Sequence, residues 1–286
     1  PSIFKRLKQS NSNLKVASIV HWDAINTQFF TNDVAQINSV HCGLSDADVV
    51  TKAIEFMNAG GDFTFVHLDD PDHEGHANGF GTSYDNSILA ADQKLGQLLN
   101  AVESLRSSTG DDWLVLVTTD HGREASGYNH GNQTRSEKST FIATNKTLNA
   151  EFTNYSAAIG NIAFDGLYGF PAQTSITPTL LRHMGVEPQA NWQLDGIPLL
   201  GNLGLRKIMT GSLNNLTWLN GQSGSFALYR NGSFVQNISA ASGSWIDPIV
   251  SKGIVDYTVL LNNTPVSYRF GKLSTDITVG LNWDNN

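Results

Sequence analysis

The sequence predicts an α/β domain with a mostly parallel sheet sandwiched by helices, followed by a small all-β sandwich. Two observations lead to this expectation. Up to about residue 203, short apolar stretches alternate with amphipathic helical stretches, which is typical of parallel sheets. Beyond that point the helical periodicity is lost, and short apolar stretches follow one another at even spacing. We therefore expect two domains, at residues 1–203 and 204–286.

Composition excludes several classes of protein. The 286 residues are 40% hydrophobic, as in an ordinary globular protein, and no apolar run approaches the roughly 18 residues of a membrane span. The formal net charge of −8 argues against binding to a nucleic-acid polymer, which requires clustered Lys and Arg. The single cysteine, Cys42, excludes an intramolecular disulfide and a cysteine-rich zinc site. We expect Cys42 to be a small buried side chain.

The first half of the α/β domain contains two predicted strands and one helix. Residues 14–20 and 62–68 are apolar runs of strand length. Between them, Ser45 and Asp48 form a capping-box pattern that begins a helix, and Gly60-Gly61 end it. This strand–helix–strand order predicts a parallel pair of strands.

The second half continues the alternation. We expect a long amphipathic helix at about residues 84–106 and a strand at 113–118. The latter is nearly all apolar, as in a parallel sheet with both faces covered. A short strand follows at 139–143, and Thr177-Pro178 begin a last helix that Gly185 ends.

The C-terminal region has the signals of an all-β domain. Asn-Gly within Arg230–Ser233 and Asn262-Asn263 each lie between alternating apolar residues, which predicts two β-hairpins. Residues 216–219 are another predicted strand. We expect the core of this domain to contain Trp218, Trp245 and Tyr257. The order Thr-Trp, Leu-Tyr-Arg-Asn-Gly and Asp-Tyr-Thr-Val resembles a fibronectin type III-like module.

Polar residues that can carry chemistry follow two of the predicted strands. Residues 69–76 come directly after the strand at 62–68, and residues 119–122 come directly after the strand at 113–118. Ligands of open α/β sheets bind beyond the carboxyl ends of parallel strands, so the two segments can face one cavity. We interpret Asp69 and Asp70, which begin the first segment, as turn formers.

Five side chains in these segments are candidate metal ligands. Asp72 and His76 are four residues apart, so one helical turn or a tight loop aims both at one point. Asp120 and His121 are adjacent, and His130 lies in a loop flanked by glycine. Carboxylate and imidazole together suit zinc or a similar divalent ion.

Each motif also has a simpler interpretation. The Asp120-His121-Gly122 sequence can be a turn after a strand, in which glycine supplies backbone freedom. A lone His130 can be a solvated loop residue. Their joint occurrence at two strand ends favours a metal site. We interpret His67 as a core residue or a neighbour of the ligands, and we expect His73 to be exposed. Structural roles are expected for His21, His41 and His183.

Four segments resemble the alkaline phosphatase superfamily, in particular its type I phosphodiesterase/nucleotide pyrophosphatase branch. Residues 71–79 resemble its Asp-x-x-Gly-His-x-x-Gly segment, and residues 118–122 match its second-metal strand end. Residues 130–137, with His-Gly followed by Arg-Ser-Glu, are similar to a downstream His-Gly loop of bacterial members. Residues 176–185 resemble its closing helix.

The resemblance covers roughly residues 15–203 and implies an alkaline phosphatase-like fold with two divalent metal ions, for which we expect zinc. It implies that Asp72, His76 and His130 hold one ion. It implies that Asp120 and His121 hold the other.

The family's further Asp ligand and its Thr or Ser nucleophile have no match between Pro1 and Asp62. We therefore expect the nucleophile upstream of Pro1 and interpret the chain as a fragment. The basic residues Lys5, Arg6 and Lys8 would form its ragged end.

The resemblance implies a metal-dependent hydrolase of phosphoric esters, with a small phosphate-ester substrate and a covalent phospho-enzyme in the intact protein. A sulfatase or phosphonate hydrolase of the same superfamily is an alternative, as is a non-catalytic secreted binding protein. Asn132 begins a glycosylation sequon two residues from His130, where a glycan would crowd the cavity. We therefore expect a bacterial protein that is periplasmic or secreted.

Overall fold

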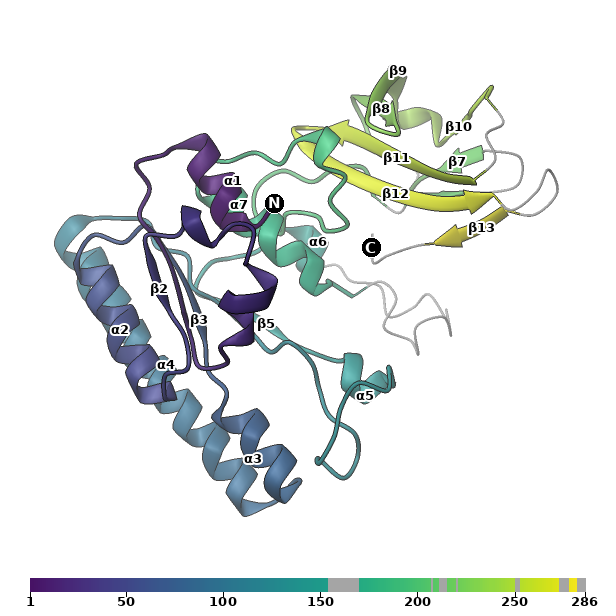
Figure 1. The fold of residues 1–286 in the computed structure, drawn as a ribbon. Helices are drawn as coiled ribbons and strands as arrows, with labels where there is room; N and C mark the ends of the chain where they lie inside the picture. The colour runs from purple at the N-terminus through teal and green to yellow at the C-terminus, as the bar shows by residue number, and fades with distance from the viewer. Residues whose placement is uncertain are drawn as a thin grey trace. The chain divides into compact units, whose positions relative to one another are not determined.

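The structure, a computed structural model, describes residues 1–153, 170–206, 208–210, 215–219, 221–249, 253–272 and 278–281. The chain divides into two units, Pro1–Asn145 and Lys146–Asn286, which are described separately below (Figure 1). This division falls earlier than residue 203, where the character of the sequence changes, and the domain boundary at that residue stays a prediction. None of the helices in the described ranges is both long and apolar enough to cross a bilayer.

A three-stranded parallel sheet forms the centre of the first unit. Its strands are β1 (Val16–Val20), β2 (Ser39–His41) and β3 (Phe63–His67), in the order β2-β1-β3. Strand β1 is buried along its whole length, as a central strand covered on both faces should be. The predicted parallel pairing of the strands at 14–20 and 62–68 is therefore confirmed.

Two long helices lie side by side along one face of this sheet (Figure 1). Helix α2 (Asp46–Asn58) begins after Ser45, whose side chain accepts a hydrogen bond from the Asp48 N–H, as predicted. Helix α4 (Thr82–Thr109) ends at Gly110, which adopts the left-handed conformation that glycine favours. Apolar side chains of α2 pack against β1, so the sheet and this helix share one core.

The basic N-terminal residues form a capped helix, and the expectation of a ragged end was wrong. Ser2 caps helix α1 (Ile3–Ser10), and Phe4 and Leu7 on its apolar face are fully buried. The ring of Phe4 packs edge-on against Phe63 of β3. Hydrophobic spacing within these few residues therefore outweighs the flanking charges.

Two short helical turns follow β1, η1 (Ile25–Phe29) and η2 (Val34–Gln36).

The apolar strand predicted at 113–118 pairs differently from our expectation. Within the described residues, β4 (Leu116–Thr118) pairs antiparallel with β5 (Ile142–Thr144) in a separate two-stranded sheet. Residues 113–117 are only half-buried, so the apolar run did not mark a strand covered on both faces, and such a run carries no information about the pairing partner. Cys42 is exposed, because it lies in the loop after β2, and the prediction of a buried thiol was wrong.

Among the described residues of the second unit, two antiparallel sheets share one hydrophobic core. One sheet has the order β10-β7-β6 and the other the order β13-β12-β11-β8-β9. The strands are β6 (Met209–Thr210), β7 (Asn215–Thr217), β8 (Ser225–Arg230), β9 (Ser233–Ser239), β10 (Ser244–Ile246), β11 (Gly253–Leu261), β12 (Thr264–Lys272) and β13 (Thr278–Leu281).

Both predicted hairpins are confirmed. Asn231-Gly232 connect β8 to β9, and Asn262-Asn263 connect β11 to β12, with all four residues at positive φ. Such turns match the twist of antiparallel strands. Trp218 and Tyr257 are buried in the shared core and Trp245 packs against it, as expected.

Helical segments precede the β sheets in the second unit. Helix α7 (Ile176–His183) is followed by Gly185 in the left-handed conformation, as predicted. Ile197 and Leu205 belong to the same core as the β strands, so residues on both sides of position 203 pack together. The other short elements are α6 (Ala150–Thr153), η4 (Gln173–Ser175), η5 (Ala190–Trp192) and η6 (Ala240–Ser242).

Candidate metal centre

Helix α3 (Asp70–Asn78) carries the first two predicted ligands. The helix begins directly beyond β3, with Pro71 in its first turn, where the missing N–H of proline costs no hydrogen bond. The four-residue spacing places Asp72 and His76 on the same face. The Nε2 atom of His76 lies 3.4 Å from the Oδ2 atom of Asp72.

The loop after β4 brings His121 to the same carboxylate. Its Nε2 atom lies 3.8 Å from Asp72 Oδ1. Its Nδ1 atom lies 2.9 Å from the Gly122 carbonyl oxygen and donates to it, so Nε2 is the ring nitrogen that faces Asp72. Asp120 reaches this group through His121, since its Oδ2 atom lies 3.6 Å from His121 Nε2. The Asp120 side chain is 71% exposed.

His130 completes the group. Its Nε2 atom lies 3.0 Å from His76 Nε2 and 3.7 Å from Asp72 Oδ1, and its ring stacks on His121 with a centroid distance of 3.6 Å. Four of the five predicted ligands therefore meet, and the fifth, Asp120, adjoins them. We call Asp72, His76, His121 and His130 the Asp72 cluster.

The surroundings of His130 favour the neutral imidazole, the form that binds metals. Partial burial lowers its pKa, and the neighbouring ring of His121 lowers it further by charge repulsion. Asp72 acts in the opposite direction but does not outweigh these effects. A neutral imidazole is the ligating form, so protons compete less with a cation at this position.

Two glycines lie where an added side chain would crowd the cluster, Gly122 against backbone and Gly75 against the Arg123 side chain. A Cβ atom on Gly122 would lie 2.0 Å from the Ser136 carbonyl oxygen, at the short helix α5 (Arg135–Lys138). Gly122 does not have a positive φ, so close approach rather than conformational freedom explains it. On α3, a Cβ atom on Gly75 would lie 2.4 Å from the guanidinium carbon of Arg123.

Arg123 is the site residue that the sequence did not reveal. Its buried guanidinium donates from Nη2 to the carboxylate and the backbone carbonyl of Asp72, and from Nη1 to the Gly127 carbonyl oxygen. It thereby connects the loop after β4 to α3. Its position directly after Asp-His-Gly was the only signal in the sequence, and an arginine in a loop is ordinarily solvated.

A second polar group lies at the beginning of α3. His21 Nδ1 lies 2.7 Å from Asp46 Oδ1 and 3.8 Å from Asp70 Oδ1. Asp70 also pairs with Lys94 at 3.2 Å, so it does more than form a turn. The sequence did not suggest these pairs, because their members are far apart in the chain.

The other histidines lie outside both groups. His73 is exposed, as predicted, and His67 is half-buried in β3 with its Nε2 atom 3.8 Å from Asp69. His41 ends β2 and His183 ends α7 in the second unit.

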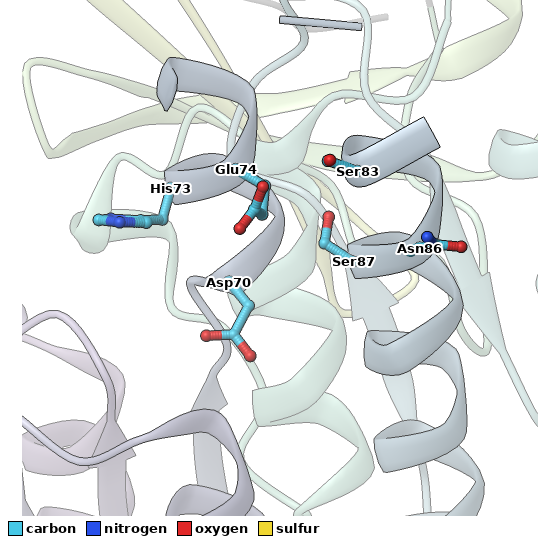
Figure 2. Close-up of a pocket in the computed structure, with 6 residues that line it drawn as sticks. All are labelled: Asp70, His73, Glu74, Ser83, Asn86 and Ser87. Carbon is cyan, nitrogen blue, oxygen red and sulfur yellow. The ribbon is translucent and has the colours of Figure 1, made fainter. Parts of the chain in front are cut away.

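An open hollow of about 530 Å³ lies between α3 and α4 (Figure 2). Its lining is polar on both helices. By helical spacing, the residues that α3 contributes lie on a different face from Asp72 and His76. The hollow and the Asp72 cluster therefore share a helix but not a surface. The lining residues are Asp70, His73, Glu74, Ser83, Asn86 and Ser87.

Comparison with known protein families identifies the class of this chain. The model of the metalloenzyme superfamily matches residues 9–163, which is more than half of the 286 residues and includes all five predicted ligands. The chain belongs to the metalloenzyme superfamily. This membership indicates a metal-dependent enzyme, and together with the Asp72 cluster it indicates divalent metal binding. Among curated proteins, none matches the chain at a significant level.

Proposed function

We propose that this chain provides the metal centre of a metal-dependent hydrolase of phosphoric esters, of the phosphodiesterase/nucleotide pyrophosphatase or phosphatase type in the intact protein. One observation carries the proposal. Neighbouring ligands on a tetrahedral zinc ion are about 3.3 Å apart, given Zn–N and Zn–O bonds of about 2.0–2.1 Å. His76 Nε2 and His130 Nε2 are 3.0 Å apart, His76 Nε2 lies 3.4 Å from Asp72 Oδ2, and His130 Nε2 lies 3.7 Å from the other oxygen, Asp72 Oδ1. These three side chains fit one ion and leave one coordination position open, as catalysis requires.

Asp120 and His121 support a second ion beside the first. They offer a carboxylate and an imidazole 3.6 Å apart, and His121 contacts both Asp72 and His130. Two divalent ions about 4 Å apart can stabilise the attacking and the leaving oxygens of a phosphoryl transfer. The five ligands are two carboxylates and three imidazoles, which favours zinc over magnesium or calcium.

The protein's own groups would prepare this centre. Bound divalent ions supply charge stabilisation at the phosphoryl oxygens and hydroxide near neutral pH. Arg123 holds the Asp72 carboxylate in place, and the Nδ1–H of His121 selects the tautomer that offers Nε2. Burial and His121 lower the pKa of His130, which favours the neutral imidazole whose lone pair can bind a metal ion.

We further propose that the β region is a fibronectin type III-like module and that the protein is bacterial and periplasmic or secreted. Two antiparallel sheets that share one core support the first proposal. Asn132 is exposed and close in sequence to His130, so a glycan there would obstruct the Asp72 cluster, which supports the second.

Zinc binding and ester hydrolysis test the proposed function together. The zinc-loaded full-length protein, with the segment that is expected to carry the nucleophile, is assayed on nitrophenyl phosphate mono- and diesters and on nitrophenyl sulfate, with and without a chelator. We expect turnover of a phosphate ester that is lost on chelation and in Asp72→Asn. Turnover of the sulfate ester alone would indicate a sulfatase. Tight zinc binding with no turnover of any ester would instead indicate a binding protein.

A further inference from the structure

The carboxylate of Asp46 is buried at the point where two helices begin. Its side chain is 0% exposed, and it is the first residue of α2. It accepts hydrogen bonds from the backbone N–H groups of Asp69 at 2.9 Å and Asp70 at 3.1 Å. His21, directly after β1, donates a third hydrogen bond from Nδ1 at 2.7 Å. One carboxylate thus connects β1, α2 and the beginning of α3.

This group is saturated, which distinguishes it from the Asp72 cluster. Asp46 accepts three donors, and Lys94 places an ammonium 3.2 Å from the nearby carboxylate of Asp70. Burial alone would raise the pKa of Asp46, but the hydrogen bonds from Asp69, His21 and Asp70 outweigh it and lower the pKa. An ionised, satisfied carboxylate beside an ammonium has no need of a cation. We therefore interpret the group as an anchor.

Helix α3 needs such an anchor. The first N–H groups of a helix have no partner within it, and short helices are marginal on their own. Within the described part of the chain, the Asp69 side chain makes no capping hydrogen bond. Asp46 supplies this cap from another helix. Its negative charge also faces the positive end of α3, which is stabilising.

We propose that Asp46 and His21 are positioning residues for the metal centre: Asp46 fixes the beginning of α3, and His21 fixes Asp46. The ligands Asp72 and His76 lie two and six residues beyond the second anchored N–H group, that of Asp70. Their place opposite His121 and His130 therefore depends on where α3 starts. This inference rests on the metal centre proposed above.

The test compares Asp46→Asn with Val49→Ala in the full chain. Asparagine keeps the size of the side chain but loses the charge and turns an N–H group toward backbone donors. We expect faster amide exchange at Asp69, Asp70 and along α3, and zinc affinity about tenfold weaker. Val49 is buried on the same helix and packs against β1. Its truncation should lower stability and leave zinc affinity and α3 exchange unchanged.

His21 provides a rescue experiment. Asparagine can present an N–H donor near the place of Nδ1, whereas alanine cannot. We expect His21→Ala to weaken zinc binding and accelerate α3 exchange, and His21→Asn to restore most of both. A role in packing alone would predict equal losses in the two variants.

The outcomes separate this inference from the proposed function. If wild-type protein binds no zinc, the proposed centre is wrong, and α3 exchange in the zinc-free protein still decides whether Asp46 and His21 fix the beginning of α3. Unchanged exchange at Asp69 and Asp70 in Asp46→Asn would overturn it. So would an equal loss of zinc affinity in Val49→Ala.

Discussion

Asp72 in the first unit and Asp247 in the second each gather polar side chains, yet their surroundings differ. Asp247 is 1% exposed and fully satisfied: Arg230 Nη1 lies 2.8 Å from both of its oxygens, and Ile249 N–H and the Tyr257 hydroxyl also donate to it. Asp72 is 36% exposed, and its three imidazole neighbours lie 3.4–3.8 Å away, beyond ordinary hydrogen-bond distance.

The difference separates a structural polar group from a ligand site. A buried carboxylate is stable only when its oxygens accept hydrogen bonds or ion pairs. The donors around Asp247 meet this need. Burial and the hydrogen bond to Asp247 raise the pKa of Tyr257, so its hydroxyl remains a donor. Around Asp72, Arg123 donates to one carboxylate oxygen, while three imidazole nitrogens converge on the carboxylate at distances too long for hydrogen bonds, which leaves room for a cation. We therefore expect mutations around Asp247 to lower the stability of the protein and mutations around Asp72 to weaken metal binding.

The largest expected effect is on the stability of the second unit. Asp247→Ala leaves Arg230 and the Tyr257 hydroxyl without their acceptor, and breaking a buried pair in this way costs about 3–5 kcal/mol. Arg230 is partly exposed, so we expect the lower end of this range. Denaturant unfolding, with amide exchange in β8 and β11 to isolate this unit, measures the loss. Zinc affinity should not change, and a loss below about 1 kcal/mol would mean that the group is not structural.

The next effect is on metal binding at α3, where two histidines provide a matched pair. His76→Ala removes a ligand, and we expect zinc affinity to fall about 100-fold, which corresponds to about 2.7 kcal/mol. His73→Ala alters an exposed histidine of the same helix and should leave zinc affinity unchanged. Competition with a chromogenic chelator measures both. Equal losses in the two variants would show that α3 contributes to binding only as a scaffold.

Much of this comparison could be predicted from local sequence. The apolar runs at 14–20 and 62–68, the cap at Ser45 and the Asn-Gly hairpin are all fixed by neighbouring residues, and the structure contains each of them. The convergence of Asp72 and His76 follows from helical spacing. Their meeting with His121 and His130 was expected from strands of one parallel sheet, but β4 belongs to a separate antiparallel sheet, so that reasoning does not explain it.

What the sequence could not reveal is contact between distant residues. Arg123 and Asp46 act through partners 51 and 23–25 residues away, and nothing in their own neighbourhoods distinguishes them from solvated charges. The pairing of β4 with β5 was missed for the same reason, because an apolar strand fits a parallel or an antiparallel partner equally well. Local patterns determine elements, and only the folded chain determines which elements meet.

A smaller effect is expected at Arg123. This residue is buried, like the structural group around Asp247, but it also donates to the proposed metal ligand Asp72. Lysine cannot donate to the Asp72 carboxylate, the Asp72 carbonyl and the Gly127 carbonyl at once. We expect Arg123→Lys to weaken zinc binding about tenfold, or about 1.4 kcal/mol. Gly75→Ala should do the same, because the new methyl group would displace the guanidinium. Unaltered affinity in both variants would limit Arg123 to a packing role.

The smallest effect concerns the pH dependence of stability at Asp46. Like Asp247 in the second unit, Asp46 in the first unit is a buried carboxylate whose oxygens accept several hydrogen bonds. Its pKa is lowered in the folded chain, so its contribution to stability is complete above the unfolded-state pKa of about 3.9 and is lost as the pH falls through the folded-state pKa. We expect the stability of the first unit to decline below about pH 4 in wild type and to decline less steeply in Asp46→Asn. Val49→Ala should lower stability at every pH with an unchanged slope. If the unfolding free energies of wild type and Asp46→Asn depended on pH in the same way, the folded chain would not stabilise the ionised carboxylate of Asp46.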